Sequence, residues 1–143
     1  MKKLKLLNKK VFPKKIKKIP EQLILKGIQA NRCTNNSKII IENNSDFQIL
    51  YVEGFIIVTE DNIERAVAHA WNRIESYNYF DVSSNLINSS TYKNEYKIEY
   101  FPFFEYKIDE LPKEINGVLP FSKIFEKYII EAKKKYPTND IVQ

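Results

Sequence analysis

Residues 33–81 read CTNNSKIIIENNSDFQILYVEGFIIVTEDNIERAVAHAWNRIESYNYFD, and this stretch decides the fold that we expect. Its segment Gln48–Val58 is rich in Ile, Val, Tyr and Phe and is bounded by polar residues, which predicts a β-strand. Two more strands are predicted at Val67–Ile74 and Tyr77–Val82. The short polar break Glu75–Ser76 between them is typical of a hairpin. The second and third strands should therefore pair in antiparallel fashion.

Both faces of the first predicted strand, Gln48–Val58, are largely apolar, which indicates a covered strand inside a sheet. A polar loop at Thr59–Arg65 should follow it. Glu53 is then an acid among hydrophobic residues, and a buried carboxylate is costly without a partner. Either Glu53 pairs with a cation or a polar group near a functional site, or its side of the strand is wet. Both alternatives stay open.

Ahead of these strands, the segment from Cys33 to Glu42 follows a polar loop and looks like a helix that closes at Asn43–Asn44. The apolar residues 39–41 would suit a strand as well, so periodicity alone leaves both open. A helix would place the Cys33 thiol in a first turn, beside unpaired backbone N–H groups and the positive end of the helix dipole. That environment lowers the pKa of a thiol and favours the thiolate.

The chain holds one cysteine and one histidine, Cys33 and His69. If the predicted hairpin turns near Ser76, residue i faces roughly residue 151 − i, and position 69 lies opposite about 82. Asp81 is within one residue of that point. Side chains on one face of paired strands are roughly 4.5–8 Å apart, which lets a carboxylate orient an imidazole ring. We therefore expect Asp81 to meet His69.

The remaining segments complete the predicted domain. Pro20–Leu25 is expected to form a short helix. Strands are expected at 96–101 and 103–108, where Pro102 between them suits a bend or an edge. An amphipathic helix is predicted at Phe121–Tyr136, because its apolar residues follow the i, i+3, i+4 spacing of a helix packed on a core.

Composition indicates one globular domain with a basic arm. A chain of 143 residues with 43% hydrophobic residues is long enough for one core. Residues 1–18 hold nine lysines and no acid, whereas the whole chain carries only +5. We divide the chain into a basic arm, 1–18, and a single domain, 19–143. The arm could bind nucleic acid or an anionic membrane surface through phosphate groups, or could be a solvated extension.

Cysteine usage and hydropathy bear on location. One cysteine allows no internal disulfide, and a reduced thiol fits the cytosol. No stretch approaches the length of a membrane span or of a signal peptide. We therefore expect a cytoplasmic protein without membrane insertion.

Several short segments together carry a resemblance to a known family. Tyr51-Val-Glu-Gly-Phe55, His69-Ala-Trp-Asn72 and Phe80-Asp-Val82, preceded by Cys33, resemble the transglutaminase-like branch of the papain-like cysteine fold, over roughly residues 29–84. The resemblance implies an α+β fold in which the cysteine heads a helix packed on an antiparallel sheet. It also implies that the histidine and the aspartate come from adjacent strands.

The resemblance implies roles that thiol chemistry also requires. Cys33 as a thiolate would attack an amide or ester carbonyl, and His69 would hold the proton and return it to the leaving amine. Asp81 would fix the tautomer and steady the imidazolium. An oxyanion donor is still needed. The backbone N–H of Cys33 is the first candidate, with the side chain of Gln29 or Asn31 as an addition.

Three functions remain in view. The first is cysteine-dependent acyl transfer or amide hydrolysis on a protein or peptide. The second is a binding protein that keeps the fold without the reaction, such as a phage or mobile-element factor acting on a host protein. The third is a nucleic-acid-associated protein that uses the Lys-rich arm 1–18. Trp71 is either a core residue or a substrate platform. One Cys and one His are too few soft ligands for zinc, so we expect no metal site and no cofactor.

Overall fold

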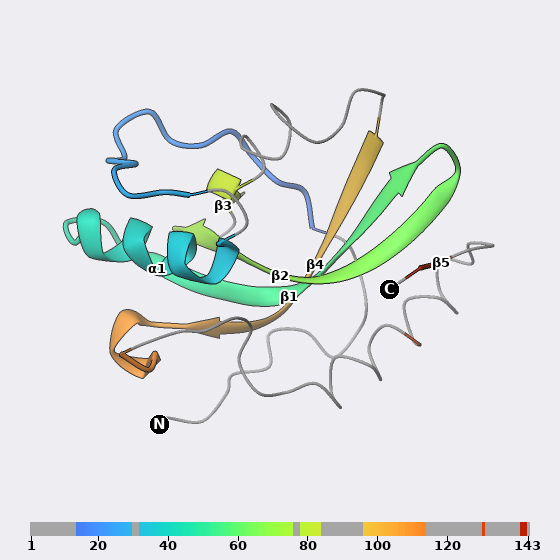
Figure 1. The fold of residues 1–143 in the computed structure, drawn as a ribbon. Coiled ribbons are helices and arrows are strands. Elements are labelled where there is room, and N and C mark those ends of the chain that lie inside the picture. The colour runs from blue at the N-terminus through green and yellow to red at the C-terminus, as the bar shows by residue number, and fades with distance from the viewer. Residues whose placement is uncertain are drawn as a thin grey trace.

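In the part of the chain that the structure describes, one helix packs on a curled sheet of four antiparallel strands, and a short fifth strand adds to this sheet in parallel. The protein is a small α+β domain (Figure 1). The computed structural model describes residues 14–29, 32–75, 78–83, 96–113, 130 and 141–142. Its elements in chain order are helix α1 (Cys33–Asn43), strands β1 (Ile49–Glu60), β2 (Ile63–Ile74), β3 (Asn78–Phe80) and β4 (Tyr96–Tyr106), the 3-10 turn η1 (Ile108–Glu110), and strand β5 (Ile141–Val142).

The helix begins at Cys33, as the sequence predicted. Residues 39–41, which could have formed a helix or a strand, are helical. Its inner face carries Ile40 and Ile41, both buried against the sheet. Asn72 of β2 ties the helix to the sheet, because its side-chain amide donates to the backbone oxygen of Ser37 at 3.0 Å. These contacts hold α1 against the sheet.

Strands β1 and β2 form a long hairpin. Asp61 and Asn62 make its two-residue turn, with φ of 51° and 63°. Two successive left-handed residues are the pattern of a type I′ turn, which Asn and Asp tolerate and which matches strand twist. The polar loop expected at Thr59–Arg65 is therefore wrong. Pairing runs without a break from Glu60 opposite Ile63 at the turn to the far ends of both strands.

The sheet order is β3-β2-β1-β4, so β4 lies at one end and Pro102 sits on an end strand, as expected. The two segments predicted on either side of Pro102 form one strand with a bulge. Glu53 pairs with Phe104 while Gly54 pairs with Pro102, which leaves Phe103 as the extra residue. A proline has no backbone N–H to donate, so a bulge beside Pro102 breaks few hydrogen bonds of the sheet.

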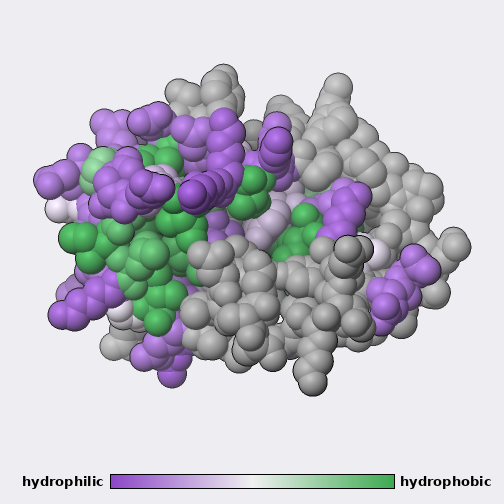
Figure 2. Space-filling view, turned by 90° about the horizontal axis from the view of Figure 1, so that it is seen from above, coloured by the Kyte–Doolittle hydropathy of each residue, from purple (hydrophilic) through white to green (hydrophobic). Residues whose placement is uncertain are grey.

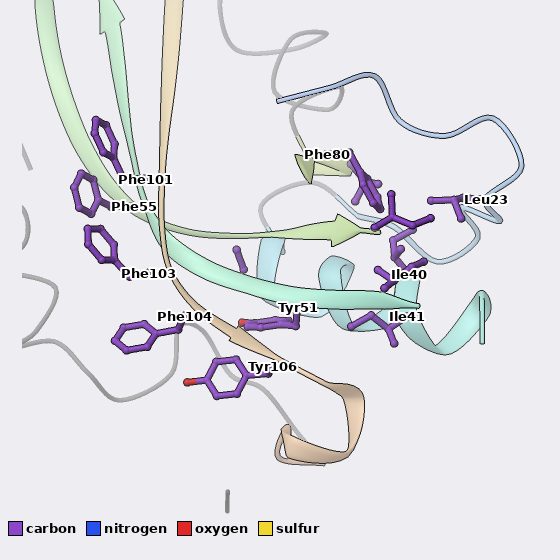
Figure 3. Packing of buried hydrophobic residues seen from close by; sticks show 14 of the residues in the cluster. Leu23, Ile40, Ile41, Tyr51, Phe55, Phe80, Phe101, Phe103, Phe104 and Tyr106 are labelled. Atoms are coloured by element: carbon purple, nitrogen blue, oxygen red, sulfur yellow. The ribbon is translucent and has the colours of Figure 1, made fainter. Parts of the chain in front are cut away.

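Two apolar clusters cover the two faces of β1. The cluster on the α1 side joins alternate residues of β1 to the helix and to β4, with Phe55 stacked on Phe101 and Phe103 at centroid distances of 4.8 and 5.3 Å (Figure 3). The cluster on the opposite face contains Val52, Ile56, Val58, Trp71 and Tyr100. The prediction of a covered strand is confirmed, because these side chains are all less than 9% exposed.

Residues 14–17 close the curled sheet on the side opposite α1. The N–H of Lys14 donates to the backbone oxygen of Tyr100 on β4 at 2.8 Å, and the N–H of Lys17 donates to that of Tyr79 on β3 at 2.7 Å. Strands β3 and β4 are the two ends of the sheet order, so this short segment joins them. Ile16 packs into the second cluster. The described part of the predicted arm thus lies against the sheet.

The short helix expected at Pro20–Leu25 is wrong, because this segment forms isolated turns. The side chain of Asn44 binds the backbone of Ile24 on both sides, accepting from its N–H at 2.8 Å and donating to its oxygen at 3.1 Å. A backbone group paired in this way is withdrawn from a helix. Ile24 and Leu25 are 57% and 42% exposed, and Figure 2 shows an apolar area among hydrophilic side chains on this side of the molecule.

The helix predicted at Phe121–Tyr136 lies outside the described residues. Among the residues that the structure does describe, no helix has the length and apolarity needed to cross a bilayer.

The bulge opposite Gly54 yields a prediction about stability. A Cβ at position 54 would stand 2.1 Å from the backbone oxygen of Phe101 and 3.1 Å from the backbone nitrogen of Phe103. Backbone atoms cannot yield without shifting β4, so Gly54→Ala should lower the free energy of unfolding by about 2 kcal/mol or more. Val67→Ala, on exposed β2 surface, should cost less than about 1 kcal/mol. Urea unfolding curves that coincide for the two variants would contradict this.

Candidate active site

The N-terminal end of α1 lies at an edge of β2 that the other strands leave open. Strand β2 pairs with β5 at residues 64–65 and with β3 at residues 72–74, and no described strand pairs with it in between on that edge. Cys33, the first residue of α1, reaches this gap, and the backbone N–H of Ala70 bonds to its sulfur. The fold thus places the Cys33 thiol against Ala70, the residue that follows His69 on β2.

His69 and Asp81 meet, as the sequence predicted, with 2.7 Å between Nε2 and Oδ2. The register differs from the predicted one by one residue. Asn72 pairs with Phe80 and Ile74 with Asn78, so position 69 would face 83 and not 82. Asp81 still reaches the ring because the sheet pairing ends at Phe80, so the residues after β3 do not follow the strand register. Contact between the two side chains depends on the end of this pairing as well as on the pairing itself.

The Cys33 thiol and the His69 imidazole form the second link. Hydrogen bonding and charge between the two groups shift the pKa of each, and Nδ1 is the ring nitrogen left for the sulfur because Nε2 is held by Asp81. Burial on its own would raise the pKa of Cys33, but the hydrogen bond and the positive charge of His69 outweigh it and the thiol pKa is lowered. The ion pair of thiolate and imidazolium is therefore favoured.

The carboxylate of Asp81 favours the charged form of the ring. Burial on its own would lower the pKa of His69, but the charge of Asp81 and its hydrogen bond raise the pKa to about 10. Asp81 itself has a lowered pKa, because the imidazolium and further donors outweigh the effect of burial. Both side chains are nearly closed to solvent, at 7% and 1% exposed. Screening by water is weak there, so the pair holds its charges across neutral pH.

Three further residues hold this pair, and the sequence analysis missed them. The hydroxyl of Tyr100 donates to Oδ2 of Asp81 at 2.7 Å, and the N–H of Ser83 donates to Oδ1 at 2.9 Å. Asn36 of α1 then donates to the Ser83 hydroxyl at 3.0 Å. The Asp-Val-Ser spacing is that of an Asx-turn and could have revealed Ser83. Tyr100 lies on a strand 19 residues further on, and no local pattern marks it.

The residues considered for oxyanion and substrate binding have different positions. Gln29 is exposed, and its backbone N–H and oxygen bind the Asn36 side chain at 3.0 and 2.8 Å. Gln29 therefore contributes to the structure through its backbone and not through its side chain. Asn31 lies outside the described residues. The first turn of α1 has no side-chain cap, so no cap occupies its backbone N–H groups, and the Cys33 N–H is still the first candidate for the oxyanion donor.

Glu53 and Trp71 are both fully buried. Of the two alternatives for Glu53, the structure has the polar partner, since the Tyr51 hydroxyl donates to Oε2 at 2.7 Å. Burial, the Glu53 carboxylate and then the charge of Cys33 raise the pKa of Tyr51, which places this pair near the thiol. Trp71 is part of the second cluster, and its ring lies 5.8 Å from that of His69. It fills the core beside the histidine.

Titration of the single histidine tests this electrostatic arrangement. The ring resonance of His69 in an NMR titration should have its midpoint near pH 10, because Asp81 stabilises the protonated ring. Asp81→Asn removes that charge and leaves the burial, so the midpoint should fall by at least about two units. Asp46→Asn, which alters an exposed acid, should leave it unchanged. A wild-type midpoint near the ordinary value of about 6.5 would rule out the charged pair.

Searches of protein-family models, of curated proteins and of solved structures found no match to this chain. Among the described residues, no group of three or more His, Cys, Asp and Glu side chains is arranged to hold a metal ion. The site consists of a thiol, an imidazole and a carboxylate in series.

Proposed function

We propose that the protein catalyses cysteine-dependent acyl transfer or amide hydrolysis, with Cys33 as nucleophile, His69 as acid and base, and Asp81 as the residue that orients the ring. One observation carries the proposal. The only cysteine and the only histidine of the chain, 36 positions apart, lie close enough for each to shift the pKa of the other, and a buried carboxylate hydrogen-bonds to the ring at 2.7 Å. Such a series of contacts is what an activated thiol requires.

The first half of the reaction forms a thioester. The thiolate of Cys33 attacks the carbonyl carbon of an amide or ester, a C–S bond forms, and the carbonyl oxygen takes the negative charge. The Cys33 N–H at the start of α1 stabilises that oxyanion. When the intermediate collapses, the C–N or C–O bond breaks, and His69 gives its proton to the leaving group.

The second half releases the thiol. Water or an amine attacks the thioester carbon, and neutral His69 takes the proton of the attacking group. The C–S bond then breaks, and the thiolate is restored beside the imidazolium. Asp81 keeps the same ring nitrogen directed at the sulfur throughout and does not need to change its own protonation. The two halves are balanced for both hydrolysis and transfer.

We also propose that the domain has a papain-like core of the transglutaminase-like type. The features that support this are a helix headed by Cys33, an antiparallel sheet beneath it, and His69 and Asp81 contributed by β2 and by the turn after β3. The substrate would be a protein or a peptide. The reaction would belong in a reducing compartment such as the cytoplasm, because oxidation of the sulfur removes the nucleophile.

Alkylation of the lone thiol provides the first test. At pH 6 to 7, iodoacetamide should label Cys33 on the order of tenfold or more faster in the wild type than in His69→Ala, because without the imidazolium the thiol is mostly protonated there. The chain has no second cysteine, so mass spectrometry reports this site alone. Val67→Ala, on the same strand, serves as the matched control. Equal rates in folded wild type and folded His69→Ala would reject the enzyme proposal and favour a binding protein.

Trapping of the thioester provides the second test. With p-nitrophenyl acetate, the wild type should show a burst of p-nitrophenol and gain one acetyl group, because acylation of Cys33 precedes the slower second half. Cys33→Ser should lose the burst, and Asp81→Asn should slow it by on the order of tenfold or more. Acetylation that persists in Cys33→Ser would place the label on another residue and reject Cys33 as the nucleophile.

A further inference from the structure

We propose that Tyr100 is a positioning residue that holds Asp81 ionised and turned toward His69, so that the site is a series of four residues. This inference rests on the proposed function, since the orientation of Asp81 matters to the reaction only if the thiol and imidazole react. Tyr100 comes from β4, whereas the other three residues come from α1, β2 and the turn after β3.

The hydrogen bonds of Asp81 fix both of its oxygens. Oδ2 accepts from His69 Nε2 and from the Tyr100 hydroxyl, each at 2.7 Å, while Oδ1 accepts from the Ser83 N–H at 2.9 Å. The side chain of Asp81 is 1% exposed. Water cannot readily replace a donor at that depth, so loss of the hydroxyl would leave Oδ2 with one fewer partner. Donors to a carboxylate also stabilise its charged form.

The direction of the Tyr100 hydroxyl is set independently of Asp81. Its ring packs edge-on against Trp71, with centroids 5.2 Å apart and planes at 74°, inside the second cluster. Its backbone pairs with Ile56 of β1 on one side and accepts from Lys14 on the other. A residue whose backbone is paired on both sides and whose ring packs on Trp71 presents its hydroxyl at a fixed point. Tyr100 can therefore act as the reference against which Asp81 is oriented.

Asp81 needs such a reference because its own strand is short. Strand β3 has three residues and is held to β2 by three register pairs, of which Asn72–Phe80 is the last before Asp81. Beyond it, the Tyr100 hydroxyl on Oδ2 and the Ser83 N–H on Oδ1 hold the two ends of the carboxylate, which opposes rotation of the carboxylate away from the ring. A carboxylate turned away from the ring supports the imidazolium less well, and the pKa of His69 should then fall.

The test is an NMR titration of His69 in Tyr100→Phe, which removes the hydroxyl and keeps the ring. Both the variant and its reference should carry Cys33→Ala, so that ionisation of the thiol does not distort the curve. We expect Tyr100→Phe to lower the midpoint of His69 by about one unit or more. Tyr79→Phe is the matched control, because Tyr79 packs against the same cluster and has no hydrogen bond to Asp81 among those that the structure describes. It should leave the midpoint unchanged.

A double-mutant cycle separates positioning from packing. In an Asp81→Asn background, Tyr100→Phe should shift the midpoint of His69 little, because the hydroxyl acts through the carboxylate. An unchanged or raised midpoint in the single variant, or an equal shift in both backgrounds, would overturn the proposal and leave Tyr100 as a core residue. If Tyr100→Phe does not fold, Tyr100→Leu removes the same hydroxyl and decides by the same readout.

Alkylation rates distinguish this proposal from the proposed function. With Cys33 present and the anionic reagent iodoacetate, the fast alkylation has an alkaline limit because it needs the imidazolium charge. That limit should move to lower pH in Tyr100→Phe, in step with the fall in the His69 midpoint. Should the midpoint fall as expected while wild-type Cys33 reacts no faster than in His69→Ala, the enzyme proposal fails and the link between Tyr100 and the His69–Asp81 pair stands. Fast alkylation that is lost in His69→Ala but unchanged in Tyr100→Phe would support the enzyme proposal and overturn the role of Tyr100.

Discussion

The hydrogen bond between His69 Nε2 and Asp81 Oδ2, 2.7 Å long and almost closed to solvent, is the constraint on which the rest of the structure depends. A buried carboxylate without a partner costs several kcal/mol, and so does a buried imidazolium. Each therefore requires the other. Strand β3 must pair with β2, and the chain must turn immediately after Phe80, for both costs to be offset. The local architecture around β3 follows from this requirement.

The gap in the edge of β2 is the second requirement. Strand β3 is short and β5 pairs further along, so the backbone between them on that edge is open to α1. The N–H of Ala70 then bonds to the sulfur of Cys33 and not to a neighbouring strand. A longer β3 would have taken this N–H into the sheet and kept the helix away. The position of the thiol therefore depends on the residue at which the pairing of β3 with β2 ends.

Side-chain amides hold the helix in that position. Asn36 links α1 to Ser83 and to the backbone of Gln29, and Asn72 links β2 to Ser37. Buried amides of this kind are specific about distance and direction, whereas apolar contacts tolerate small displacements. The helix could slide along the sheet at modest apolar cost, but not without breaking these bonds. They set the distance from Cys33 to His69 with the precision that an ion pair needs.

The sequence by itself predicted the three strands β1, β2 and β3 and the approach of Asp81 to His69, because composition and turn residues are local signals. It also placed the start of a helix near Cys33, although periodicity alone left helix or strand open at residues 39–41. It did not determine the register between β2 and β3, which differs from the predicted one by one residue. It also did not determine the tight turn at Asp61 and Asn62 or the absence of a helix at Pro20–Leu25. Tertiary structure alone decided the contacts of Tyr100 and of residues 14–17. These join chain positions up to 86 residues apart, and they form only because the sheet curls until its two ends approach.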